Sequence, residues 1–252
     1  MRIRRRSAAI FALAAVGVIA VAAVAIAAPT STFTFKMSPA NAPKTTYTNG
    51  SLFTDLKTTY TNPGNNNPGG AIQRTQIYLD KNWKINTGAA AKCSSSQLAG
   101  KTMKQAMAAC KNALVGTGTA SATANGLFEI HGCVLLFNGQ PQSGLPTLKV
   151  FTRVQASNPS NISCANPSTN TQGNATVLLN GVLKNATAPY GKVLDVDHIT
   201  QSASFPLEEF KTTIKHGSYI QAKCPTSPWH MKTTWTYNNN TTKTVSKTQP
   251  CT

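Results

Sequence analysis

Cys93 and Cys110 lie 17 positions apart and enclose the segment that most restricts how this chain can fold. Two capping boxes, each a hydroxyl at the helix N-cap with a glutamine three residues later, occur within it. They are Ser94 with Gln97, and Thr102 with Gln105. Gly100 lies between them, at a position typical of the residue that follows a helix. The pattern therefore predicts two short helices with a bend at residues 100–101.

A disulfide between the two cysteines requires the same bend. One continuous helix would separate them by about 25 Å, at about 1.5 Å per residue, whereas a disulfide holds its Cα atoms roughly 4.4–6.8 Å apart. The alternative is a continuous helix with two free cysteines. Residues 75–80 and 113–124, on either side, are rich in β-branched side chains and lack helical periodicity, which predicts strands.

Residues 1–27 have the composition of a signal peptide. Four arginines near the start precede an Ala/Val/Ile-rich run, and Ala25-Ile26-Ala27 fits a cleavage site of the small-x-small type. The apolar run is also long enough for an uncleaved membrane anchor, because roughly 17–25 residues span a bilayer. We therefore expect a signal peptide at residues 1–27, or an anchor if it is not cleaved, and a single extracytoplasmic domain at residues 28–252.

Six cysteines in an exported chain predict three disulfides, because exported proteins meet oxidising conditions. Several pairings are possible in principle. The simplest joins neighbours in the sequence: Cys93–Cys110, Cys133–Cys164 and Cys224–Cys251. The sequence has no CxxC pair and no cysteine–histidine spacing of the kind that binds zinc. We therefore predict neither a metal site nor a cofactor.

The chain after the predicted leader is strongly basic. Removing the four leader arginines from 24 Lys+Arg leaves 20 cations against seven acids, a net charge of +13. Only Arg74 and Arg153 are arginines, and a lysine is a point charge without the bidentate fork of arginine. The sequence has no P-loop, zinc-finger or RNA-binding motif. It predicts general attraction to anionic envelope polymers or lipid headgroups, and no specific nucleic-acid binding.

Alternation of apolar and polar residues predicts a mainly β fold. In residues 229–237, Trp, Met, Thr, Trp and Tyr alternate with His, Lys and Thr, which is typical of a strand with one buried face. Residues 32–37, 52–61, 127–137 and 148–154 are further predicted strands, and Asn125-Gly126 predicts a hairpin turn. We therefore expect an antiparallel β-sandwich with one small helical insert at residues 94–110, closed by a disulfide. Residues 62–70 are expected to form a flexible loop.

Several short motifs are distributed along the chain. They are Leu79-Asp80-Lys81-Asn82, Ile85-Asn86, Val115-Gly116-x-Gly118, Pro189-Tyr190-Gly191-Lys192 and the final pair of cysteines. Their combination resembles a group of uncharacterised exported proteins of actinobacteria, which carry signal peptides and disulfides. The resemblance covers most of the chain and implies export, but no particular activity.

Asp195, Asp197 and His198 form the only cluster of acids and histidine in the sequence. On a strand, the two aspartates point to one face and His198 to the other, which keeps the three apart. At a strand end this restriction is relaxed, and a Ca²⁺ or hydrolytic site becomes conceivable. These residues are the catalytic candidates, and solvated side chains at a strand end are the alternative interpretation.

We predict structural roles for two further pairs of polar residues. Glu129 and His131 share a strand face, where we expect a hydrogen-bonded pair. Glu208 and Glu209 point to opposite sides of a strand, so they do not form the carboxylate dyad of a glycosidase.

The tryptophans are Trp83, Trp229 and Trp235, and they would form either core or an aromatic platform for glycans. The alternation over residues 229–237 favours burial. The sequence also lacks the Gly-x-Ser-x-Gly elbow of many hydrolases. We therefore expect a secreted or cell-envelope protein with a structural or binding role. The alternatives are an extracellular hydrolase that uses residues 195–198 and a glycan-binding protein.

Overall fold

The computed structural model describes residues 29–60, 70–124, 128–156, 164, 175–199 and 206–252. The strands are β1 Thr30–Ser38, β2 Thr48–Asn49, β3 Ser51–Thr59, β4 Ile72–Asp80, β5 Trp83–Ile85, β6 Leu114–Ala124, β7 Phe128–Gln142, β8 Leu145–Ala156, β9 Ala175–Asn185, β10 Tyr190–Asp197, β11 Leu207–Ile214, β12 Ile220–Ala222, β13 Trp229–Tyr237 and β14 Thr242–Gln249. The helices are α1 Ser95–Leu98, α2 Met103–Cys110 and the 3-10 helix η1 Lys111–Ala113. The predicted leader, the turn at Asn125-Gly126 and all but the last residue of the predicted loop at 62–70 lie outside the described residues.

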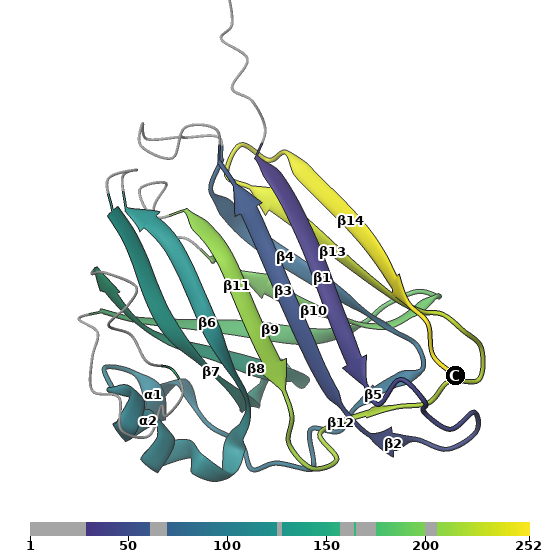
Figure 1. Cartoon of the computed structure of the whole chain (residues 1–252). Coiled ribbons are helices and arrows are strands. Elements are labelled where there is room, and N and C mark those ends of the chain that lie inside the picture. The colour runs from purple at the N-terminus through teal and green to yellow at the C-terminus, as the bar shows by residue number, and fades with distance from the viewer. Residues whose placement is uncertain (1–28, 61–69, 125–127, 157–163, 165–174, 200–205) are drawn as a thin grey trace, which may run out of the picture.

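One antiparallel sheet of 11 strands forms the body of the protein, in the order β1-β3-β11-β6-β7-β8-β9-β10-β4-β13-β14. Its two end strands, β1 and β14, come together. The side-chain amide of Gln249 accepts a hydrogen bond from Met37 N and donates one to Met37 O, both at 2.7 Å. The sheet therefore curls into a nearly closed barrel, in which β9 and β10 cross behind β3 and β11 (Figure 1).

The prediction of a mainly β, antiparallel fold is confirmed, but a single curled sheet takes the place of the two separate sheets of a sandwich. Sandwiches and barrels both need strands with one apolar face, so alternation does not distinguish them. Register shifts do bend a sheet. They occur between Leu114 and Gly116 of β6 and between Leu207 and Glu209 of β11. Such irregularities are features that the apolar–polar pattern does not reveal.

A second sheet, in the order β2-β12-β5, covers one end of the barrel. β2 precedes β3, β5 follows β4 and β12 follows β11, so the three short strands continue from neighbouring parts of the barrel. Ile220 and Ala222 of β12 and Trp83 of β5 are buried and belong to the barrel core. At the opposite end of the barrel, β3 ends and β11 begins (Figure 1).

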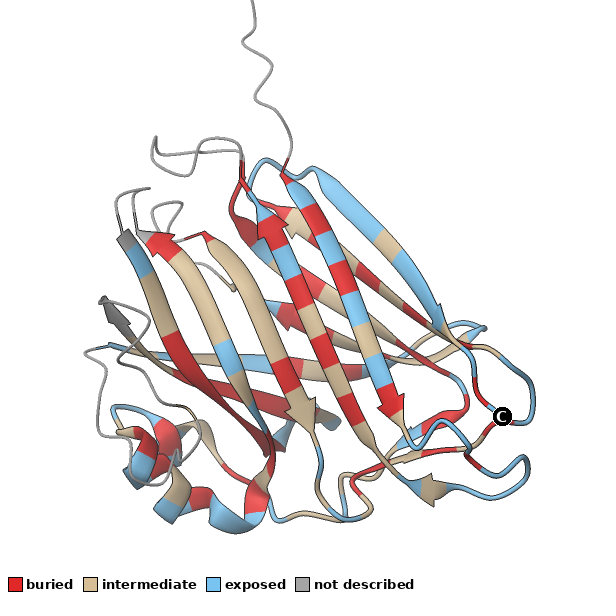
Figure 2. Cartoon of the chain, in the orientation of Figure 1, coloured by how far each residue is buried: buried red, intermediate tan, exposed pale blue. Residues whose placement is uncertain are grey.

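The helical insert is folded as predicted. Both capping boxes form, and Gly100 at the bend has a φ of +69°, a conformation that favours glycine. The insert lies on the outer face of β7 and β8, where Leu98, Met103, Phe137 and Phe151 share one buried cluster. The middle of β7 is therefore buried on both faces, as the red segments in Figure 2 show.

A buried lysine fastens the insert to the barrel. Lys149 Nζ donates hydrogen bonds to Ser95 Oγ of α1 and to Asn180 Oδ1 of β9, both at 2.8 Å. Burial lowers the pKa of Lys149, because removal from water disfavours the charged amine. Among the described lysines, Lys149 alone is buried.

Three disulfides join cysteines that are neighbours in the sequence. Cys93–Cys110 closes the insert, Cys133–Cys164 is attached to β7, and Cys224–Cys251 ties the C-terminal end to the segment after β12, with Cα–Cα distances of 5.7, 5.4 and 6.0 Å. Three disulfides are consistent with an extracytoplasmic protein. Within the described part of the chain, no helix is long and apolar enough to cross a membrane.

Candidate functional site

Asp195 lies on the outer face of β10, because its neighbours Leu194 and Val196 point into the barrel. Its side chain is 5% exposed and accepts hydrogen bonds of 2.5 to 2.7 Å from Arg74 on β4 and Lys184 on β9. Burial raises the pKa of Asp195, but the bonds from the two cations outweigh it and hold the pKa below its ordinary value. Asp195 is thus the centre of a structural ion cluster.

Asp197 and His198 are exposed where β10 ends. Asp197 Oδ1 accepts a hydrogen bond from the backbone N–H of His198 at 2.8 Å, and the two side chains are 3.8 Å apart at their closest polar atoms. Over the residues that the structure describes, no three His, Cys, Asp or Glu side chains are grouped to hold a metal ion. Asp195 is therefore held by Arg74 and Lys184, whereas Asp197 and His198 contact each other at the exposed end of β10.

The other polar pairs have the expected places. Glu129 Oε2 and His131 Nε2 are 2.9 Å apart on the outside of β7. Glu209 points outward and pairs with Lys57 at 2.9 Å, while Glu208 is among the residues that line the barrel interior. These two glutamates form no dyad.

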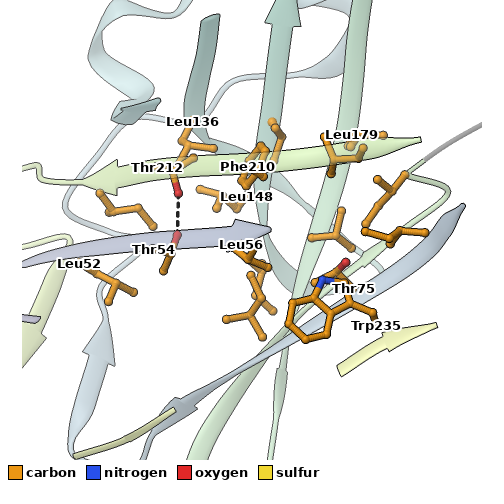
Figure 3. Close-up of a pocket in the computed structure, with 18 of the residues that line it drawn as sticks. Leu52, Thr54, Leu56, Thr75, Leu136, Leu148, Leu179, Phe210, Thr212 and Trp235 are labelled. Carbon is orange, nitrogen blue, oxygen red and sulfur yellow. Dashed lines mark hydrogen bonds between the residues drawn. The ribbon is translucent and has the colours of Figure 1, made fainter. Parts of the chain in front are cut away.

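All three tryptophans of the chain are buried in the barrel core. Trp83 and Trp229 lie edge to face, with ring centroids 6.0 Å apart. Trp235 lines the interior beside Thr75 (Figure 3). No tryptophan is therefore available for an aromatic platform on the surface.

A cavity of about 100 Å³ lies inside the barrel. Its lining comes from strands all around the sheet, and most of it is aliphatic or aromatic. Figure 3 shows Leu52, Leu56, Leu136, Leu148, Leu179, Phe210 and Trp235 converging on it. The alternation of β3, β8, β10, β11 and β13 turns one apolar face of each strand toward this space.

The polar side chains of the cavity differ in their hydrogen bonding. Thr54 Oγ1 and Thr212 Oγ1 lie 2.9 Å apart in a hydrogen bond across β3 and β11, so each satisfies the other (Figure 3). Glu208 brings a carboxylate to the lining, and Thr123 Oγ1 on β6 donates to its Oε1 at 2.5 Å. Glu208 is the only residue with a charged side chain among the described residues of the lining.

The size of the cavity limits what it can hold. Pockets for drug-sized ligands measure roughly 300–1,000 Å³, and an apolar cavity of about 150 Å³ holds one benzene molecule. A space of about 100 Å³ accordingly suits a group of about four heavy atoms. Non-covalent capture of a short apolar group is the chemistry that this interior offers.

The cavity is a site that the sequence interpretation missed, although part of its lining lies on strands that the sequence predicts. One signal could have indicated it: Glu208, Phe210, Thr212 and Ile214 alternate along β11, which places a carboxylate on the apolar face of the strand.

Comparison of the chain with family models, with curated proteins and with solved structures finds no match. The functional assignment therefore rests on the geometry of the barrel.

Proposed function

We propose that this protein is an exported, non-enzymatic binding protein of the cell envelope or the extracellular medium, and that it holds a small apolar ligand inside its barrel. The observation that carries the proposal is the apolar cavity of about 100 Å³. An apolar group that enters this space leaves water without separating any hydrogen-bonded pair of the protein. The predicted signal peptide and the three disulfides support a place outside the cytoplasm.

The strength of such binding has an upper bound. The best very small ligands gain about 1.5 kcal/mol per non-hydrogen atom. A four-carbon alcohol, with about five such atoms, would gain at most about 7.5 kcal/mol, which corresponds to a dissociation constant of a few micromolar. We therefore expect affinities in the micromolar to millimolar range.

The surface supports a second part of the proposal, attraction to anionic envelope polymers or lipid headgroups. Carboxylates pair with four of the cations: Lys57, Arg74, Lys184 and Lys211. The net charge of +13 after the predicted leader is therefore carried mostly by lysines at the surface. Such charge would hold the protein near anionic polymers through long-range Coulomb attraction.

An NMR titration with 1-butanol tests the proposed function. We expect saturable shifts of the residues that line the cavity, and loss of binding in Val196→Phe, which fills the interior from β10. The matched control is Val182→Phe on β9, where residue 182 pairs with Asp195 on the outer face and should leave binding unchanged. Circular dichroism checks that both variants are folded, because overpacking costs about 1–3 kcal/mol. Equal binding by Val196→Phe, or shifts confined to the outer surface, would overturn the proposal.

No observation favours the alternative of a hydrolase at residues 195–198, since the oxygens of Asp195 are held by two cations. A glycan platform built on tryptophans lacks support as well, because the three tryptophans are buried.

A further inference from the structure

We infer that the ligand of the barrel interior carries a hydrogen-bond donor, above all a primary amine. The carboxylate of Glu208 accepts the hydrogen bond from this donor. The inference rests on the proposed function and adds the chemical class of the ligand: a short alkyl chain with a donor or cationic head. It is carried by the position of Glu208 on the lining of an otherwise apolar cavity.

A register shift lies at the position of the carboxylate. On β11, Leu207 pairs with Ala122 of β6 and Glu209 pairs with Ser121, so Glu208 occupies an extra position opposite β6. As a result, Leu207 and Glu208 both line the cavity. The buried Tyr60, directly after β3, fixes this bulge, because its hydroxyl donates to Leu207 O at 2.9 Å. Glu208 is thus held at the end of the barrel opposite the three-stranded sheet.

The bonding of the carboxylate is incomplete. A carboxylate can accept several hydrogen bonds through its two oxygens. Thr123 Oγ1 donates to Oε1, and this is the hydrogen bond that the half-buried Glu208 accepts from the described residues. A carboxylate beside an apolar space is costly unless donors or a cation compensate it. A ligand amine would supply that compensation, while its alkyl chain would extend among Leu56, Leu194 and Phe210.

The net charge of the protein makes this preference diagnostic. The surface is strongly positive, so its general field attracts anions and repels cations. If the interior binds an amine more tightly than a carboxylate, its preference is the opposite of the one that the positive field of the surface produces. Only a local negative group could produce it, and Glu208 is the one that lines the cavity within the described structure.

The experiment compares three probes with the same four-carbon chain: butylamine, 1-butanol and butyrate. NMR titrations at neutral pH give the three dissociation constants for the wild type, Glu208→Gln and Glu209→Gln. Glu209→Gln is the matched control, because it removes the same charge one residue away, from a side chain that pairs with Lys57 on the outside. In the wild type and in Glu209→Gln we expect butylamine to bind about tenfold more tightly than 1-butanol, as expected for a hydrogen bond to a charged group, and butyrate to bind least. In Glu208→Gln the amine should lose this advantage while 1-butanol binds as before.

The outcomes separate the inference from the proposed function. If amine and alcohol bind equally well in the wild type, or if Glu208→Gln leaves their ratio unchanged, the inference is wrong and the apolar site remains. If none of the three probes enters the cavity, the proposed function itself is wrong. A preference for butyrate would overturn the inference in favour of control by the general positive field.

Discussion

At the scale of single residues, the cluster around Asp195 is asymmetric. The carboxylate is 5% exposed, whereas the side chains of Arg74 and Lys184 are 39% and 45% exposed. Removal of the carboxylate therefore leaves two cations that can return to water. Removal of both cations leaves a buried charge without compensation, which is the costlier change.

The asymmetry predicts which of two changes, loss of the carboxylate or loss of both cations, destabilises the protein more. Asp195→Asn should lower the free energy of unfolding by about 2 kcal/mol, the range for a lost hydrogen bond to a charged group. The double variant Arg74→Met, Lys184→Met should lower the free energy of unfolding by about 3–5 kcal/mol, because the buried carboxylate loses both of its cationic partners. Urea unfolding of the three proteins measures both costs. The reverse order would show that Asp195 is not held as described.

The same cluster predicts a dependence on pH. Because the pKa of Asp195 is lowered in the folded state, its contribution to stability is complete above the unfolded pKa of about 3.9. It is lost as the pH falls through the lower, folded pKa. The difference in unfolding free energy between wild type and Asp195→Asn should thus be constant above about pH 5 and shrink below about pH 4. A difference that grew on acidification would contradict the sign of the shift.

The sequence allowed part of this site to be predicted. Alternation along the strand correctly predicted the burial of Trp229 and Trp235. The partners of Asp195 could not be predicted, because Arg74 precedes it by 121 positions and Lys184 lies on a different strand. The pairing of β4, β9 and β10 depends on a sheet order that local patterns do not specify.

At the scale of secondary-structure elements, the helical insert is an addition to the outside of the barrel. Its capping boxes involve residues three positions apart, which is why the sequence predicted them. The closure of β1 on β14 could not be predicted, because the Met37–Gln249 contact spans 212 positions.

Loss of the Cys93–Cys110 disulfide should loosen the insert and leave the barrel interior intact. A bridge that closes a loop of this length stabilises by about 3 kcal/mol. We therefore expect Cys93→Ala, Cys110→Ala to unfold about 3 kcal/mol more easily, with faster hydrogen exchange in α1 and α2 and unchanged binding of 1-butanol. Loss of butanol binding by a folded double variant would place the insert in the binding site, contrary to its position on the outer face of β7.

Close contact between β6 and β11 depends on a glycine. A Cβ atom on Gly118 would lie 2.0 Å from Lys211 O, which is backbone of the paired strand. Gly118→Ala should therefore destabilise the barrel by about 1–3 kcal/mol or more, as overpacking does. Gly88→Ala is the control, because its nearest neighbour would be a side-chain atom at 3.4 Å. Equal thermal stability of the two variants would contradict the close approach of the strands.

At the scale of the whole molecule, the lysine-rich surface and the apolar interior make opposite predictions about salt. Coulomb attraction is screened over about 10 Å at 0.1 M salt and about 3 Å at 1 M. Retention of the protein on isolated cell envelopes should therefore fall steeply as NaCl rises to 1 M, with little preference among polyanions of similar charge density. Binding of 1-butanol in the interior should persist at 1 M NaCl. Salt-resistant, sugar-specific retention would refute the electrostatic explanation of envelope binding.

The most direct test of ligand binding inside the barrel is a crystal structure of the protein soaked with 1-bromobutane, in which the anomalous scattering of bromine locates the ligand. The apolar cavity predicts a bromine peak inside the barrel, among the side chains of Leu56, Leu194 and Phe210. The peak should be absent in Val196→Phe and present in Val182→Phe. A barrel interior without bromine, with peaks only on the outer surface, would contradict the proposed function.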